Sequence, residues 1–437
     1  MKLLALWHSV HFHRTFWALS DQAIVSLSML VCQILLARHL PAAQYGTFAL
    51  LFGGGLTLQL VNATLLFYPM SVRLVVARRE EHKHLFASSL ILIGLLSVTL
   101  GTVLASALLA FGRSELVIPS LAWFLLWQTQ EGIRRGLLAE LRPGAVIPGD
   151  SVTYVGQAIC LAGLAIAGRL SITSALIAIA LMSLLGAIVH LSRLRAPFAT
   201  PLPLRRVLAD YLEIGGWRAL ANGMFMTIRL QLLGWALAIS SGPAATAACQ
   251  AALNLMNASN PVMIGLGNIV PQAAAEGSGA GLGHAWRTVL RYASLGVPLI
   301  LGYSVVVLAF PHLALRLLYG AASQYTGLSL AVRLLITSNL VGITTDFIVW
   351  FLQGIRMIQY AVGINLAGAL AMLIFAFPLV ELHGLTGGCV AMIGANCMRL
   401  IFARRLLTRM IAREPANPAP FGSGYPAARS ADDHVTP

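Results

Sequence analysis

The chain has 437 residues, of which 58% are hydrophobic and only 10% are charged. A soluble domain carries about 25% charged residues, so these few charges exclude a soluble globular fold of this length. The net charge of +14 lies mainly in short segments between apolar runs, which argues against a nucleic-acid partner. The lipid bilayer is therefore the expected surrounding of most of the chain.

The apolar runs are long enough to cross a membrane, because a transmembrane helix needs about 20 mainly apolar residues. The first run is too long for a cleaved signal peptide, and no A-x-A site follows it. We predict an all-α integral membrane protein with about 12 transmembrane helices. The predicted spans are 16–37, 44–69, 86–111, 114–133, 147–168, 171–192, 214–239, 244–274, 289–310, 327–351, 357–379 and 384–403.

Basic residues divide unequally between the two sets of loops. One set, together with both ends of the chain, carries most of the arginines, and such loops lie in the cytoplasm. We therefore expect a multi-pass protein of a bacterial inner membrane with both termini cytoplasmic. The opposite set carries only Arg38, Arg113, Arg169 and Arg316. The basic set carries Arg73, Arg78, Arg79, Lys83, Arg134, Arg135, Arg142, Arg193, Arg195, Arg205, Arg206, Arg287, Arg291 and Arg356.

A weak internal repeat divides the spans into two halves. Pro41-Ala42-Ala43 recurs as Pro243-Ala244-Ala245, an offset of 202 residues, and Pro69 falls on Pro271 at the same offset. Each half has an even number of spans, so the halves have the same orientation and form a parallel repeat. The expected organisation is an N-terminal lobe at 1–192, a basic linker at 193–213, a C-terminal lobe at 214–403 and a disordered cytoplasmic tail at 404–437.

Four stretches are similar to a known family: ARHLPAAQYGTFAL at 37–50, EGIRRGLLAELR at 131–142, QAALNLMNASNPVMIGLGNIVPQAAA at 250–275 and the segment 351–393. The chain resembles the bacterial polysaccharide flippases of the multidrug/oligosaccharidyl-lipid/polysaccharide exporter superfamily. The resemblance implies two six-helix lobes around a central cavity, and alternating access that flips an undecaprenyl-linked oligosaccharide for exopolysaccharide, capsule or O-antigen biosynthesis. It also implies three partners: the lipid-linked oligosaccharide, the bilayer and other polysaccharide assembly proteins.

Arginines inside predicted spans are candidates for substrate binding, because an ionisable group in hydrocarbon costs about 2.5–3.5 kcal/mol and usually faces a polar interior. Arg218 and Arg229 lie on one face of a predicted helix, roughly 16 Å apart, and Asn222 lies on the same face. The planar guanidinium suits a pyrophosphate. Alternatively, Arg218 lies near enough to the membrane surface to extend into the headgroups.

Amide side chains form a second candidate surface. Gln250, Asn254 and Asn257 share one face of the predicted eighth span. They are suited to binding sugar hydroxyls, or equally to bonding packed helices to one another.

Three further ionisable residues are candidates for gating or ion coupling. Asp21 is expected to pair with Arg218 when the lobes close on the cytoplasmic side, and to separate into water when they open. Asp346 is either a coupling site or the partner of a buried arginine. Arg333 lies near the outer end of its span, and Glu131 with Arg134 is expected to be a solvated pair.

No cofactor or metal site is predicted. The five cysteines lie in apolar runs without paired spacing, and His8, His11 and His13 suit an interfacial lead-in helix better than a metal site. The chain has no nucleotide-binding or hydrolase motif. Two functional alternatives stay open: a multidrug/cation antiporter of the same superfamily, which would have an acidic cavity, and a membrane-embedded polysaccharide polymerase or ligase. The short outer loops disfavour the latter, so we expect no enzyme.

Overall fold

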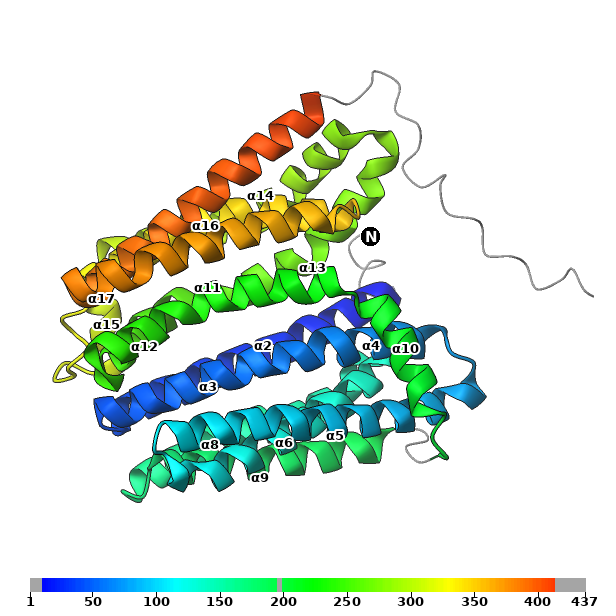
Figure 1. Cartoon of the computed structure of the whole chain (residues 1–437), viewed down its shortest axis with the longest axis horizontal. Helices are drawn as coiled ribbons and strands as arrows, with labels where there is room; N and C mark the ends of the chain where they lie inside the picture. Colours follow the sequence, from blue (N-terminus) through cyan, green and yellow to red (C-terminus); the bar gives the residue numbers. More distant parts are fainter. Residues whose placement is uncertain (1–9, 195–198, 413–437) are drawn as a thin grey trace, which may run out of the picture.

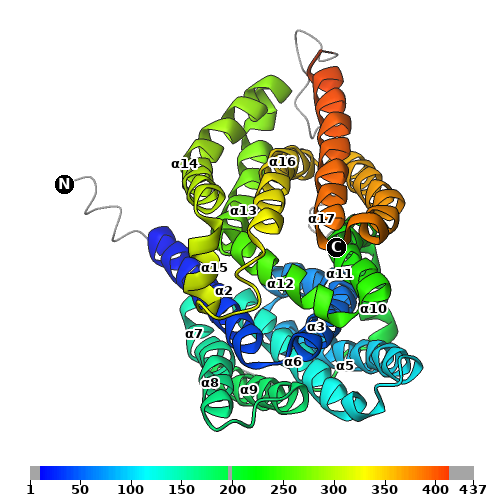
Figure 2. The ribbon, with the colours of Figure 1, turned by 90° about the vertical axis from the view of Figure 1, so that its left-hand side faces the viewer.

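The computed structural model describes residues 10–194 and 199–412, and within these ranges it consists of helices and turns without a β-strand. His8 and the segment after Ala412 lie outside the described residues. The helices form two lobes of six spans each, which confirms the predicted all-α, two-lobe class (Figure 1). Figure 2 shows the N-terminal lobe below and the C-terminal lobe above, viewed along the bundle.

The N-terminal lobe contains α2 to α9. Ser171 caps α9 through a reciprocal side-chain bond with Ser174, and Pro41 precedes the first turn of α3. Two spans contain a π-helical turn, which joins α3 to α4 and α7 to α8. The helices are α2 (Val10–His39), α3 (Ala42–Asn62), α4 (Tyr68–Val76), α5 (Arg79–Ala110), α6 (Val117–Ala139), α7 (Ile147–Asp150), α8 (Gly156–Ile166) and α9 (Ile172–Arg193).

The C-terminal lobe contains α11 to α17. Gly384 has φ 55°, a conformation that favours glycine, and this residue divides the last helix into two spans. The predicted eighth span is broken at residues 258–259 into α12 and α13. The helices are α11 (Trp217–Ser241), α12 (Pro243–Asn257), α13 (Asn260–Gly277), α14 (Leu282–Ala309), α15 (Pro311–Tyr319), α16 (Ser329–Gly354) and α17 (Ile358–Ala412).

Length and apolarity alone identify eight of the described helical segments as able to cross a bilayer, or nine if the bent α14 is one span. The second span within α17 adds one more. The twelve are completed by α6, which carries a buried charged cluster, and by the broken pair α12 and α13.

One predicted boundary is wrong, because the last helix runs on to Ala412 instead of ending at residue 403. The linker also contains a helix that was not predicted, α10 (Leu204–Gly215). On α10, Asp210 pairs with Arg73, and the Tyr211 hydroxyl lies 2.7 Å from the Ser89 hydroxyl. Burial raises the pKa of Tyr211 to about 12, so its hydroxyl stays neutral. The linker helix is therefore fixed to the N-terminal lobe.

One end of the bundle carries the basic turns, and the lobes contact each other at the opposite end. We call the end formed by α10 and the turns after α4, α6, α9, α13 and α16 the basic end, on the right in Figure 1. At the opposite end, α3 packs directly on α12, and a Cβ at Gly46 would collide with the carbonyl oxygen of Pro243. Arg38 also donates to the carbonyl oxygen of Leu317 at 2.9 Å. The lobes are therefore closed against each other at the opposite end.

Candidate functional site

A polar cavity of about 460 Å³ lies in the C-terminal lobe, among α11, α12, α13, α16 and the second span of α17. Three residues predicted from the sequence lie in its wall: Arg229, Asn257 and Asp346. The other residues of the wall are Met226, Leu230, Met256, Asn260, Met263, Ile264, Gly267, Asn268, Asn339, Gly342, Trp350, Met392 and Asn396.

Two buried arginines dominate the charge beside this cavity. Arg229 is 5% exposed and donates to the amide oxygen of Asn396 at 2.9 Å. Arg399 is completely buried and lies 2.8 Å from the Asp346 carboxylate and 2.8 Å from the amide oxygen of Asn365. Each arginine keeps a buried Nε that has no hydrogen-bond partner. The network therefore has two cations for one carboxylate, and its donors are incompletely used.

Gly368 leaves room for the side chains of these arginines because it has no side chain of its own. A Cβ at Gly368 would collide with the Arg399 side chain and would lie 3.2 Å from Cδ of Arg229. The predicted Asn222 is also buried here, but it accepts a hydrogen bond from Asn365 at 2.8 Å. Asn222 therefore orders the neighbours of Arg399 instead of lining the cavity.

The predicted amide face on α12 is divided between two roles. Asn254 donates to the hydroxyls of Tyr45 at 3.0 Å and Tyr319 at 3.2 Å, and it accepts from Gln250 at 3.1 Å. Tyr45 belongs to the other lobe, so this group is part of the closed opposite end. Of the three amides, only Asn257 lines the cavity.

A second buried ionic cluster lies in the N-terminal lobe and corrects two predictions. Asp21 is 4% exposed and lies 2.5 Å from Arg134, so it is not separated into water in this state. Arg134 also contacts Asp150 at 2.5 Å and Glu131 at 3.5 Å. The Glu131–Arg134 pair is therefore buried, not solvated, because two further carboxylates compensate the charge of the arginine.

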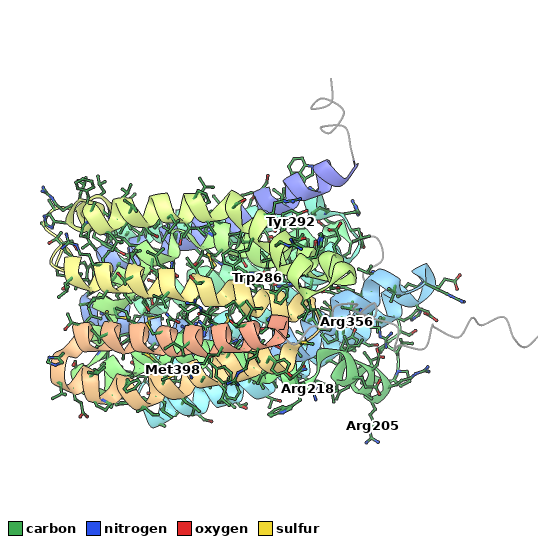
Figure 3. All side chains as sticks on the ribbon, turned by 90° about the horizontal axis from the view of Figure 1, so that it is seen from above. Arg205, Arg218, Trp286, Tyr292, Arg356 and Met398 are labelled. Atoms are coloured by element: carbon green, nitrogen blue, oxygen red, sulfur yellow. The ribbon has the colours of Figure 1, made fainter. Side chains whose placement is uncertain are left out.

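The other two predicted arginines lie away from the cavity. Arg218 is exposed near the basic end, as Figure 3 shows, and Arg333 is exposed and donates to the Leu308 carbonyl oxygen at 3.2 Å. This position of Arg218 agrees with the alternative in which its side chain extends to the headgroups.

Sequence reasoning missed Arg399 and Asp150. Arg399 lies four residues before the predicted end of the last span, where an arginine is typical of the cytoplasmic boundary. The helix in fact continues for thirteen residues beyond Arg399, to Ala412, which places this arginine deep in the lobe. Asp150 lies inside a predicted span and would have been found by asking which charge compensates Arg134.

Metal binding has no structural candidate in residues 10–194 and 199–412, where no group of three histidine, cysteine or acidic side chains could hold an ion. The five cysteines are free, and Cys32, Cys249 and Cys389 are buried.

Comparison with known proteins identifies the fold. No family model and no curated protein matches the chain. An inward-facing multidrug resistance MATE family transporter of the MOP superfamily matches with TM-score 0.72 and 17% identity, over 92% of this chain and 99% of that chain. An outward-facing structure of a MATE family transporter gives TM-score 0.64 and 16% identity, over 90% and 94%.

A third similar structure is a MOP superfamily transporter from Pyrococcus furiosus, whose binding pocket is described as having reverse polarity. It matches with TM-score 0.60 and 15% identity, over 90% of this chain and 94% of that chain. The chain therefore has the fold of a MATE transporter, with twelve transmembrane helices in two lobes. At these identities the likeness establishes the fold alone, and membership of the polysaccharide flippase family stays a prediction.

Proposed function

We propose that the chain is an alternating-access transporter that moves an anionic, lipid-linked oligosaccharide across the membrane. The observation that carries this proposal is the pair of buried arginines beside the polar cavity. Arg229 lines the cavity, and Arg399 lies directly behind it with one carboxylate, Asp346, to compensate both. A cavity with excess positive charge favours an anion over a cation.

The chemistry of the cavity wall suits a phosphate joined to a sugar. The guanidinium of Arg229 lines the cavity, and a guanidinium offers several donors in one plane to phosphate oxygens. Four amides of the wall, Asn257, Asn260, Asn268 and Asn339, supply donors and acceptors of the kind that sugar hydroxyls use.

The closed opposite end fits one step of such a cycle. Asn254 donates to Tyr45 and so joins the lobes there. Toward the basic end, Asp21 and Arg218 form no comparable contact between the lobes, because Asp21 pairs with Arg134. If the basic end is cytoplasmic, this state loads substrate from the cytoplasm. The substrate then has to favour the alternate state through contacts that it makes only there.

The test is transport by variants of Arg229 in cells that depend on this chain for polysaccharide export. Arg229→Ala should abolish export while the protein remains folded and inserted, and Arg229→Lys should restore only part of it, because an ammonium lacks the planar fork. The matched control is Arg169→Ala, an exposed arginine with no proposed role that should leave export unchanged. Full export by folded Arg229→Ala would remove the arginine from the proposed site.

A second candidate is a multidrug/cation antiporter, and the solved structures support it better than the oligosaccharide substrate, since two of the three described above are multidrug resistance transporters. The cavity wall also contains four methionines and Trp350, and methionine-rich surfaces accept varied apolar ligands. Aromatic faces attract cations. Efflux of ethidium by the reconstituted chain, without export of an anionic lipid, would favour this candidate.

A further inference from the structure

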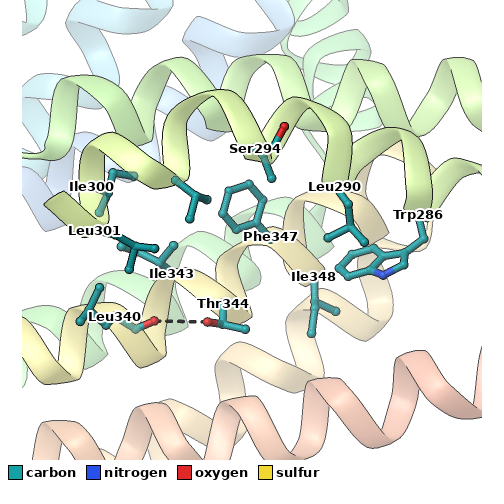
Figure 4. A pocket seen from close by; sticks show the side chains of 12 residues that line it. Trp286, Leu290, Ser294, Ile300, Leu301, Leu340, Ile343, Thr344, Phe347 and Ile348 are labelled. Atoms are coloured by element: carbon teal, nitrogen blue, oxygen red, sulfur yellow. Dashed lines mark hydrogen bonds between the residues drawn. The ribbon is translucent and has the colours of Figure 1, made fainter.

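An apolar groove of about 400 Å³ lies between α14 and α16, on a different face of α16 from the residues that line the polar cavity. Figure 4 shows the side chains that line the groove. Its two hydroxyl groups are already bonded to their own helices, Ser294 to the Arg291 carbonyl at 2.7 Å and Thr344 to the Leu340 carbonyl at 3.3 Å. The groove therefore offers a ligand mainly hydrocarbon contacts. The remaining lining residues are Trp286, Leu290, Ala293, Val297, Ile300, Leu301, Leu340, Ile343, Phe347 and Ile348.

The bend of α14 lies within the length of this groove. The helix bends by 49° between Leu282–Ser294 and Gly296–Ala309. From Trp286 to Leu301 the groove follows about 22 Å of helix at about 1.5 Å per residue. One leaflet supplies about 15 Å, half of the roughly 30 Å hydrocarbon core. A whole acyl chain of one leaflet can therefore lie along the groove.

Positive charge flanks the mouth of the groove. Arg287 and Arg291 each follow a lining residue, Trp286 or Leu290, by one position, about 100° around the helix. Both are exposed, and neither forms an ion pair with another described residue. They lie near the basic end, where a lipid headgroup would be, and Trp286 provides an amphipathic ring of the kind enriched at that depth.

We propose that this groove is a binding site for one anionic phospholipid of the leaflet at the basic end. One acyl chain occupies the groove, and the headgroup phosphate contacts Arg287 and Arg291. The groove side of α16 carries Ile343 and Phe347, and the cavity side carries Gly342 and Asp346. A bound chain therefore supports the helix that holds Asp346, so the lipid stabilises the arrangement of the cavity wall.

The experiment is native mass spectrometry of the purified full chain with phosphatidylglycerol and with phosphatidylcholine of identical acyl chains. Wild type should retain phosphatidylglycerol with at least tenfold preference. Ile343→Trp fills the groove, and the Arg287→Gln, Arg291→Gln double variant removes the charge; each should lose this preference. The double variant changes only exposed side chains, so it keeps the test decisive if Ile343→Trp does not fold.

Two control variants distinguish this site from general contact with lipid. Leu299→Trp changes a side chain of α14 that is 65% exposed and lies outside the groove, and Arg205→Gln with Arg206→Gln removes two exposed arginines on α10. Both should retain wild-type preference. Equal retention of the two lipids by wild type, or equal losses in the control and groove variants, would overturn the proposal.

Discussion

The buried pair of Arg399 and Asp346 allows a quantitative prediction. Replacing Arg399 by methionine keeps most of its volume but removes the charge that lies 2.8 Å from the carboxylate. Removing one partner of a buried ion pair costs about 3–5 kcal/mol. The Asp346 side chain keeps 26% exposure, so water in the cavity can partly solvate it. We therefore expect Arg399→Met to lower the free energy of unfolding by about 3 kcal/mol, near the lower limit of this range.

A double-mutant cycle measures the pair itself. The free energy of unfolding would be determined by reversible SDS denaturation in mixed micelles for Arg399→Met, Asp346→Leu and the double variant. Replacing both partners by apolar groups is often nearly neutral, so the double variant should be more stable than Arg399→Met, with a coupling of about 2 kcal/mol. A coupling below about 0.5 kcal/mol would refute the reasoning, because independent sites add to within that limit.

Three further predictions test the lobes separately. Asp150→Asn should cost about 1.5–3 kcal/mol of unfolding free energy, because it weakens one buried charged hydrogen bond while Arg134 keeps Asp21 and Glu131 as partners. Glu115→Gln, in an exposed pair, should cost only about 0–1 kcal/mol. Gly46→Ala should push the lobes apart at the opposite end, seen as longer spin-label distances there. Gly54→Ala is its control, since a Cβ at Gly54 has no neighbour within 4 Å; similar distances in both variants would contradict the contact with Pro243. Reporter fusions should give cytoplasmic signals after Arg78, Arg142, Arg206 and Arg356, and outside signals after Pro41, Arg113 and Gly242; an outside signal at 206 would contradict the two-lobe topology.

The fold was predictable because the bilayer imposes a length on every span. That constraint also explains the errors. Hydropathy does not detect a break such as the one at residues 258–259, because both sides of the break remain apolar enough to continue the run. It also fails at the end of a span: the arginines after residue 403 lower the hydropathy, but the helix continues to Ala412.

The site was less predictable because a sequence does not state which charges meet. Arg229 and Asp346 were found by their depth alone, and both line the cavity. Asp21 was found in the same way, but its partner is Arg134 in its own lobe, 113 positions along the chain, and not Arg218. Depth in the membrane identifies a costly charge. Its compensating partner depends on helix packing, which hydropathy does not determine.

The two ionic clusters differ in which buried groups lack a hydrogen-bond partner, and this difference indicates different roles. In the N-terminal cluster, Arg134 donates to Asp21 and Asp150, so its charge is compensated within the lobe, and the carboxylate oxygen left without a donor, Oδ1 of Asp21, is an acceptor. In the C-terminal cluster, the Nε donors of Arg229 and Arg399 have no acceptor, although an unpaired buried donor costs about 1–3 kcal/mol. A ligand in the cavity can supply oxygen acceptors to the guanidinium of Arg229, which lines the wall, whereas Arg399 lies behind it. Substrate recognition is therefore expected in the C-terminal lobe, and the N-terminal cluster is expected to act through its effect on helix packing.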